Sequence, residues 1–213
     1  MSDAAFPFMT ARTMDAGLAP ALVARMSVTG ELGYEIHAPQ AYLRAIYARL
    51  VDATRELGAT DVGMYALLSL RLEKGFGIWT REYSHDYTAL ESGLDRFVAY
   101  DKGEFIGRDA ALRERDAPPA RRLVLLEVAA AGPAHADADA LYYEPIYARA
   151  ERVGFVTSAA YGHSCGRSLA LGYVARPAAA PGTALEVTVL GERRACTVLA
   201  APPVDPAGAR MRV

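Results

Sequence analysis

The feature that most constrains the fold is a change of pattern at residues 115–120, where two adjacent prolines interrupt the chain. This segment reads Arg-Asp-Ala-Pro-Pro-Ala and has no apolar period, which is typical of a linker. Helical and extended patterns are mixed before it, whereas extended patterns follow it. The sequence therefore predicts two parts, residues 1–117 and residues 118–213.

The second part predicts a small all-β domain. Six short apolar runs have the length and composition of strands, and turn signals separate them. They are Leu123–Val128, Glu144–Tyr147, Val153–Thr157, Ser168–Val174, Ala184–Leu190 and Ala195–Leu199. Pro181-Gly182 predicts a turn, and Gly191-Glu192 stands where a two-residue hairpin loop would lie. Six strands of this kind predict an antiparallel barrel or sandwich, with residues 130–140 as a mobile loop.

The first part predicts helices and strands together. Val23–Val28 and Tyr34–His37 have extended patterns on either side of a turn, and the stretch between Met9 and Val23 predicts a short helix or a loop. An apolar stripe at helical spacing runs from Leu43 to Leu57 and ends at Gly58, which suits a left-handed C-terminal cap.

Two more helices complete this part. A second apolar stripe, from Met64 to Arg71, closes near Gly75, and a charged helix covers roughly Gly107–Arg115. The whole chain is therefore predicted to be α+β.

Composition excludes several classes of protein. The 213 residues carry a net charge of −2, which argues against a strongly basic nucleic-acid-binding protein. Two cysteines are too few for a disulfide framework. We see neither an apolar run long enough for a membrane span nor a signal peptide at the start. We therefore expect a cytoplasmic setting.

Arg71 is the most informative single residue. It continues the apolar stripe of Met64, Leu67 and Leu68, which predicts that it is buried. A buried guanidinium needs a partner, because an unpaired charge in the interior is very costly. One interpretation is a structural ion pair with Glu73 or another carboxylate. The other is a fork that binds an anionic or carbonyl-bearing ligand.

Glu35 is the second candidate. If Tyr34 and Ile36 face the core, Glu35 faces the other way, because side chains alternate along a strand. It is then either an exposed carboxylate or the acceptor of two parallel N–H bonds from a planar heterocycle such as a pterin.

Other patterns carry little chemistry. His163 and Cys165 are two residues apart, which allows a Cys–His nucleophile, but the flanking glycines favour a loop. The four histidines show no metal-ligand spacing. The pairs Arg121-Arg122 and Arg193-Arg194 are interpreted as solvated strand ends.

Several motifs, in order along the chain, resemble the glycine-cleavage T-protein (aminomethyltransferase) family. Residues 25–36 resemble its "R-x-S/G-Y-T-G-E-x-G-x-E-I" segment, and residues 69–75 its "S-L-R-L-E" helix. Asp101-Lys102 and the following Phe105–Arg108 are similar to its "D-K-x-x-F-I-G-R" stretch. Residues 153–158 and 168–174 resemble its C-terminal barrel domain. These motifs are most similar to those in the folate-binding region of dimethylglycine and sarcosine dehydrogenases.

The resemblance implies tetrahydrofolate as cofactor and one-carbon transfer as activity. Residues 1–117 would be the latter part of the folate-binding α+β region and residues 118–213 the C-terminal β-barrel. In this family the carboxylate of the "G-x-E-I" strand binds the pterin and the arginine of "S-L-R-L-E" lines the folate site; here these are Glu35 and Arg71. The family usually has a tyrosine where Val28 stands. Its catalytic aspartate lies in an N-terminal portion that has no match here, so the catalytic residue is unknown.

Two functions follow as hypotheses. The first is a tetrahydrofolate-binding subunit or half of a one-carbon transferase or amine-demethylating enzyme, which works with another protein chain such as a missing N-terminal half or an FAD-dependent dehydrogenase. The alternative is a non-catalytic module of the same family that oligomerises or docks on a partner dehydrogenase. No nucleic-acid, membrane or metal partner is expected.

Overall fold

A computed structural model describes residues 3–17 and 19–213 and divides the chain into two compact units. Unit 1 comprises Met1–Arg71 together with Asp205–Val213, and unit 2 comprises Leu72–Val204. The mixture of helices with an antiparallel barrel confirms the predicted fold class. This division groups residues by packing, and it differs from the predicted boundary at residues 117 and 118, which remains a proposal about domains.

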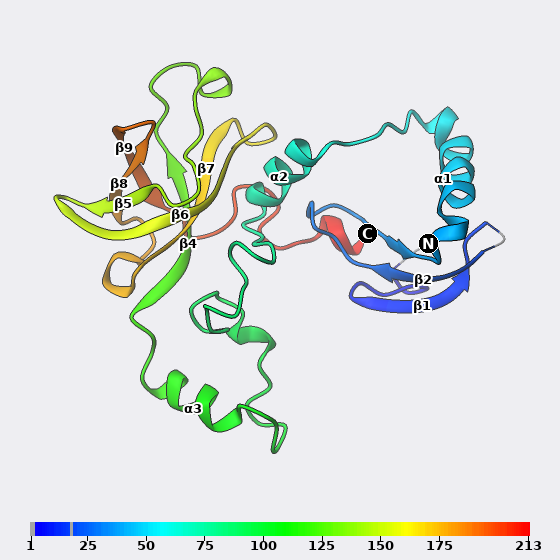
Figure 1. Ribbon diagram of the computed structural model, residues 1–213, viewed down its shortest axis with the longest axis horizontal. Coiled ribbons are helices and arrows are strands. Elements are labelled where there is room, and N and C mark those ends of the chain that lie inside the picture. Colours follow the sequence, from blue (N-terminus) through cyan, green and yellow to red (C-terminus); the bar gives the residue numbers. More distant parts are fainter. Residues whose placement is uncertain (1–2, 18) are drawn as a thin grey trace. The chain divides into compact units, whose positions relative to one another are not determined.

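Unit 2 contains a closed six-stranded antiparallel barrel (Figure 1). Its strands are β4 (Arg121–Val128), β5 (Pro145–Ala148), β6 (Glu151–Gly162), β7 (Arg167–Ala175), β8 (Ala184–Val189) and β9 (Glu192–Val198). The order around the barrel is β4-β7-β6-β5-β8-β9, and β9 pairs with β4 to close it. Each of the six predicted runs overlaps one of these strands.

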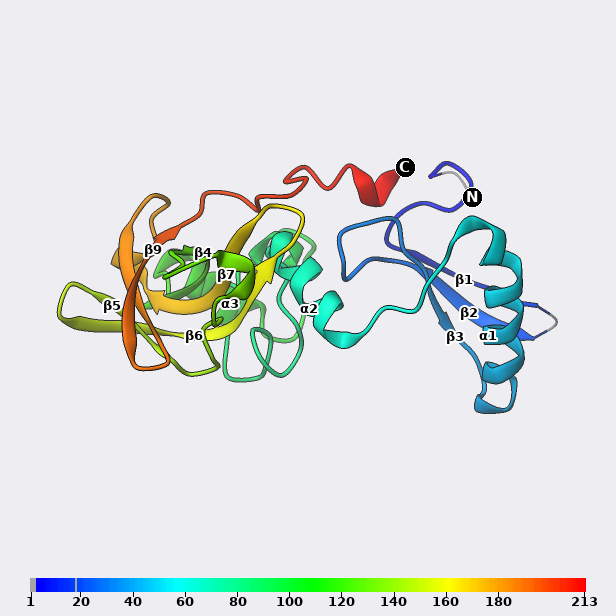
Figure 2. The same ribbon diagram turned by 90° about the horizontal axis from the view of Figure 1, so that it is seen from above.

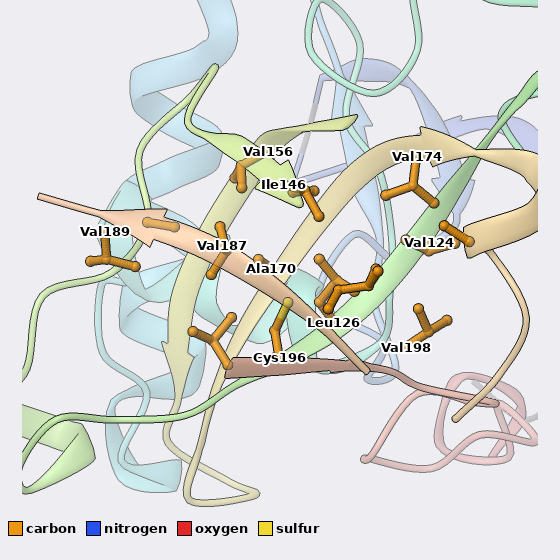
Figure 3. Close-up of a cluster of buried hydrophobic side chains, with 14 residues drawn as sticks. Val124, Leu126, Ile146, Val156, Ala170, Val174, Val187, Val189, Cys196 and Val198 are labelled. Atoms are coloured by element: carbon orange, nitrogen blue, oxygen red, sulfur yellow. The ribbon is translucent and has the colours of Figure 1, made fainter. Parts of the chain in front are cut away.

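The barrel interior is filled by side chains that alternate along the strands, as the two-residue period of a strand requires. Val124, Leu126 and Val128 of β4 meet Val187 and Val189 of β8 in this core (Figure 3). The outward-facing residues of β7 are also buried, because Leu169 and Leu171 form a second cluster with Leu72. Strand β7 is therefore buried on both faces, which explains its almost continuous apolar sequence.

Two details of the barrel differ from the sequence prediction. The β8–β9 hairpin loop consists of Leu190 and Gly191, both with positive φ (50° and 87°), so the loop lies one residue before the predicted Gly191-Glu192. Positive φ at both positions gives the twist that a two-residue hairpin needs. Strand β6 continues to Gly162, well past the predicted end at Thr157, because β7 pairs with it from Gly154 to Gly162.

Unit 1 is built on a three-stranded antiparallel sheet, ordered β1 (Thr10–Asp15), β2 (Pro20–Arg25), β3 (Glu35–His37) (Figure 2). The prediction of a helix or loop after Met9 was wrong, because all six residues of β1 pair with β2. Local sequence gives little sign of this strand, since its stability comes from the pairing with β2. Strand β2 ends at Arg25, before the predicted Val28.

The first helix of unit 1 leaves most of its apolar stripe exposed. Helix α1 (Gln40–Thr54) lies along one side of the sheet (Figures 1 and 2), yet Ile46 is its one buried residue. Leu43, Tyr47 and Leu50 are 46 %, 54 % and 46 % exposed. The helix passes into a 3-10 turn that ends at Gly58 with φ of 72°, as predicted for a left-handed cap.

The remaining helices have the predicted positions. Helix α2 (Met64–Glu73) spans the second apolar stripe, and helix α3 (Arg108–Asp116) follows Gly107, whose φ is 88°. The first residues of α2, Met64 and Tyr65, are exposed, whereas the residues at its end are buried.

A buried arginine joins distant parts of unit 1. Arg25 donates from Nη1 to the backbone oxygen of Phe6 at 2.6 Å and from Nη2 to that of Val213, also at 2.6 Å. Asp3 lies 3.4 Å from the same guanidinium. These contacts fasten the first and last segments of the described chain to β2, a role that sequence reasoning did not find because the partners are far apart in the chain.

Glycine is required where barrel strands approach closely. A methyl group at Gly154 would lie 2.1 Å from the carbonyl oxygen of Tyr173. We expect Gly154→Ala to lower the free energy of unfolding by about 2 kcal/mol or more, because overpacking forces the strands apart. Gly132→Ala, at a position with open space around it, should change stability by less than about 0.5 kcal/mol. Urea unfolding followed by circular dichroism measures both; equal stabilities would contradict the close approach.

Candidate functional site

Arg71 lies in the last turn of α2 and is buried, with 1 % of its surface exposed. The prediction from the apolar stripe is therefore confirmed. Ser69, Leu72 and Glu73 around it are buried as well. A cation that is kept from water to this degree is strongly held by its surroundings, so its position is fixed by the fold.

Glu73, two residues beyond Arg71, uses its carboxylate to hold a turn of the barrel. Its Oε1 accepts hydrogen bonds from the backbone amides of Ser164, at 2.5 Å, and Cys165, at 3.2 Å. These amides belong to the turn between β6 and β7. One interpretation of the sequence pairs Arg71 with Glu73 or another carboxylate; the structure shows that the Glu73 carboxylate holds this turn.

Glu35 lies on β3 with the predicted alternation. Tyr34 and Ile36 pack toward the small core formed by Phe6, Ala21 and Val23. Glu35 faces the other side, where its Oε2 lies 3.3 Å from Nε2 of His37, and 42 % of its side chain is exposed. The carboxylate is thus accessible and can accept further hydrogen bonds. Glu35 and Arg71 come from different elements and differ in exposure, and their shared role remains a prediction.

The turn before Glu35 explains the glycines of its motif. Gly30 has φ of 84°, and its amide donates to Ser27 Oγ at 2.9 Å. A methyl group at Gly33 would lie 2.7 Å from the carbonyl oxygen of Met26. Both glycines therefore meet backbone requirements of the turn that leads into β3. Val28 stands 39 % exposed in this turn and offers no aromatic ring for stacking on a ligand.

His163 and Cys165 do not form an activated nucleophile. Burial raises the pKa of the Cys165 thiol, and the nearby Glu73 carboxylate raises it further. A catalytic cysteine needs the opposite shift, because the thiolate is the reactive form. His163 is exposed and meets Tyr161 edge-on. The residues that the structure describes include no cluster of ligands suited to a metal ion.

The interpretation of the arginine pairs as solvated strand ends was wrong for Arg194, and Arg121, although partly exposed at the start of β4, also has specific partners. Arg121 donates to Glu91 at 2.6 Å and lies over the ring of Tyr87, and the Glu91 hydrogen bond raises the pKa of Arg121. Arg194 binds Asp137 at 2.5 Å with only 12 % of its side chain exposed. The acidic partners lie 30 and 57 residues away, so no local sequence pattern marks these pairs.

Sequence reasoning also missed a run of aromatic rings on unit 2. The rings of Tyr87 and Tyr173 are stacked, with their centroids 4.0 Å apart. The ring of Phe155 contacts those of Tyr173 and Tyr143. The ring centroids of Tyr142 and Tyr143 are 4.0 Å apart. A hydrogen bond between these two side chains raises the pKa of Tyr142 to about 12. Through Tyr87 and Phe155, this run packs against Tyr173 on the outer face of β7.

Comparison with known proteins matches both parts of the chain to one family. Residues 1–102 match the GCVT N-terminal domain, and residues 121–205 match the glycine cleavage T-protein C-terminal barrel domain. The chain belongs to the glycine-cleavage T-protein family. Its fold agrees with a crystal structure of the glycine cleavage system aminomethyltransferase T from Bartonella henselae, with a TM-score of 0.79 and 26 % identity over 93 % of this chain and 53 % of that one.

Two relatives show how this family plan varies. The chain is 36 % identical to mitochondrial dimethylglycine dehydrogenase of Mus musculus, covering all of this chain and 24 % of the dehydrogenase. It is 31 % identical to the aminomethyltransferase of Thermoanaerobacter sp. (strain X514), over 79 % of this chain and 44 % of that protein. The chain therefore spans about a quarter of one relative and less than half of the other.

These comparisons confirm the family resemblance that the sequence motifs indicate. Some relatives are mitochondrial, and the cytoplasmic setting remains a prediction. Among the described residues, the structure has no helix that is both long and apolar enough to cross a membrane.

The raised pKa of Cys165 predicts low thiol reactivity. Because less thiolate is present at a given pH, we expect iodoacetamide to alkylate Cys165 more slowly than free glutathione at pH 8, and the rate to keep rising well above pH 9. Mass spectrometry of tryptic peptides measures the rate, with Cys165→Ala as the blank. If Cys165 were labelled faster than glutathione, the raised pKa of its thiol would be contradicted and a nucleophilic role for Cys165 would be supported.

Proposed function

We propose that this chain binds tetrahydrofolate and forms the folate-binding part of an enzyme that transfers a one-carbon unit or demethylates an amine. The observation that carries the proposal is Arg71, a buried arginine at the end of α2 in the "S-L-R-L-E" motif that the family uses at its folate site. Family membership over both parts of the chain supports it.

The side chains present suit a reduced pterin. Glu35 offers an accessible carboxylate, and its two oxygens can accept parallel N–H bonds from a planar amino-pyrimidine ring. Arg71 offers a fixed planar fork of donors that suits carbonyl or carboxylate oxygens. The position of Val28 lacks a stacking ring, so polar contacts would supply a larger share of the affinity than in family members with tyrosine. When bound, tetrahydrofolate would accept the one-carbon unit.

The residues of this chain would act mainly by orientation. Glu35 would fix the ring and Arg71 a polar group of the cofactor, so that donor and acceptor meet in a reactive geometry. The donor would be an amine such as dimethylglycine, sarcosine or an aminomethyl-lipoyl protein. The catalytic acid or base is assigned to no residue of this chain.

The exposed stripe of α1 supports a role as one part of a larger assembly. Leu43, Tyr47 and Leu50 form an apolar face whose exposure to water is unfavourable. The chain covers only 53 % of the structurally similar aminomethyltransferase T. We therefore propose that this face, defined by those three residues, packs against the portion of the family fold that residues 1–213 do not contain.

A second candidate is a non-catalytic module of the same family. Val28 in place of the stacking tyrosine and the exposed face of α1 favour it. In that case a second copy or a partner dehydrogenase would cover the face, and tetrahydrofolate would not bind. Size-exclusion chromatography with light scattering separates the two candidates, because a stable homo-oligomer without folate binding supports only the second.

Folate binding tests the main proposal. Isothermal titration with tetrahydrofolate under nitrogen should give a saturable heat, for this chain alone or together with its complementing portion. Glu35→Gln and Arg71→Met should each weaken binding by about tenfold or more, because each loses a charged hydrogen-bond partner.

The matched control for these variants is Glu56→Gln, which removes a carboxylate from an exposed position of unit 1. It should leave affinity unchanged. Absence of heat both with and without the complementing portion would reject the proposal.

The face of α1 gives a separate prediction. Leu50→Glu places a charge in the apolar face and should abolish binding of the complementing portion, for which the unmatched part of the Bartonella henselae enzyme is the probe. Pull-down and light scattering measure it. Ala45→Glu, an exposed change on the other side of the helix, should have no effect. Equal binding by both variants would show that the face is not the docking surface.

A further inference from the structure

Glu73 is a buried charged residue whose side chain reaches from α2 to another element. It is 1 % exposed and accepts two backbone N–H bonds from the β6–β7 turn, 91 and 92 residues away in the chain. A carboxylate removed from water needs such donors, and two amides that donate to one of its oxygens hold it strongly. Glu73 therefore lies on α2, and its side chain binds the β6–β7 turn.

The turn is shaped to receive this carboxylate. A methyl group at Gly162, where β6 ends, would lie 2.9 Å from Cγ of Glu73 and 2.7 Å from Sγ of Cys165. Only glycine leaves the space that the glutamate side chain occupies. The sulfur of Cys165 is directed back to the carbonyl oxygen of Gly162 at 3.5 Å.

Two further contacts fix the same end of α2. Leu72 is wholly buried in a cluster with Leu169 and Leu171 on the outer face of β7. The carbonyl oxygen of Glu73 accepts a hydrogen bond from the amide of Val204 at 3.3 Å. Residues 72 and 73 are therefore held both by the barrel and by the segment that follows its last strand.

Arg71 directly precedes these two residues in the same helix. A helical turn is rigid, because its backbone hydrogen bonds fix successive residues relative to one another. Holding Leu72 and Glu73 therefore determines the backbone at residue 71 and the direction in which its side chain leaves the helix.

We propose that Glu73 is a positioning residue: by holding the β6–β7 turn, it fixes the last turn of α2 and thereby the orientation of Arg71 for its ligand. This inference rests on the proposed function only for the role of Arg71 in folate binding. The mechanical part, from the turn to the end of α2, stands on the contacts of Glu73 and can be measured without folate.

Hydrogen exchange tests the mechanical part. Glu73→Ala should speed exchange of the Ser164 and Cys165 amides and also of the amides at residues 70–73 of α2, while circular dichroism stays native-like. Glu73→Gln, which keeps one acceptor oxygen, should give an intermediate effect. Gly162→Ala disturbs the same contact from the turn and should also loosen the end of α2, so a failure of Glu73→Ala to fold leaves two variants to decide the question.

Glu144 provides a matched control. Its two carboxylate oxygens accept the amides of Leu141, at 2.5 Å, and Leu190, at 3.0 Å, so it also joins two turns of the same barrel. Glu144→Ala should speed exchange at those two amides and leave residues 70–73 unchanged. If Glu73→Ala loosens only its turn, or Glu144→Ala loosens α2 equally, the inference is overturned.

Folate affinity tests the functional part through a double-mutant cycle. Glu73→Ala should weaken tetrahydrofolate binding about fivefold or more, and should add little further loss when Arg71 is already methionine, because both changes remove the same interaction. Glu144→Ala should stay within about twofold of the native affinity.

The outcomes separate the two proposals. Full additivity of Glu73→Ala and Arg71→Met would overturn the inference while keeping folate binding. An unchanged affinity in Arg71→Met would overturn the proposed role of Arg71, and the hydrogen-exchange comparison would still decide whether Glu73 fixes the end of α2.

Discussion

Closure of the barrel is the constraint on which the rest of unit 2 depends. Strand β4 pairs with β7 over eight residues and with β9 over three, so that the sheet has no free edge. Closure puts one face of every strand into a common interior. The outer face of β7 then offers an apolar surface that needs cover. The end of α2 and the aromatic run provide it.

The sequence predicts those parts of the fold that depend on local pattern. Turn signals and short apolar runs locate all six barrel strands, and helical spacing locates α1 and α2. Strand β1 could not be found in this way, because its residues become a strand only when β2 lies beside them. The pairs of Arg121 with Glu91 and of Arg194 with Asp137 are hidden for the same reason, since folding alone brings their partners together.

The candidate residues show the same limit from the side of function. The burial of Arg71 follows from the stripe that it extends, and the outward direction of Glu35 follows from strand alternation. Neither pattern says what the side chains bind. Only the resemblance of their surrounding motifs to one family assigns them a cofactor, and the comparisons support that family and not the individual roles.

The position of Arg71 next to two structural residues has a consequence for the evolution of such a site. Leu72 fills the cluster on β7 and Glu73 holds the β6–β7 turn, so both respond to selection for stability. Because Leu72 and Glu73 already fix the backbone, an arginine at position 71 is preorganised for binding without further stabilising contacts. Conversely, a loss of ligand binding would leave the pressure on Leu72 and Glu73 unchanged. In a module that has lost its chemistry, the motif around Arg71 would therefore persist while Arg71 itself became free to vary. In this chain an arginine stands at that position, buried directly before Leu72 and Glu73, as the folate-binding proposal requires.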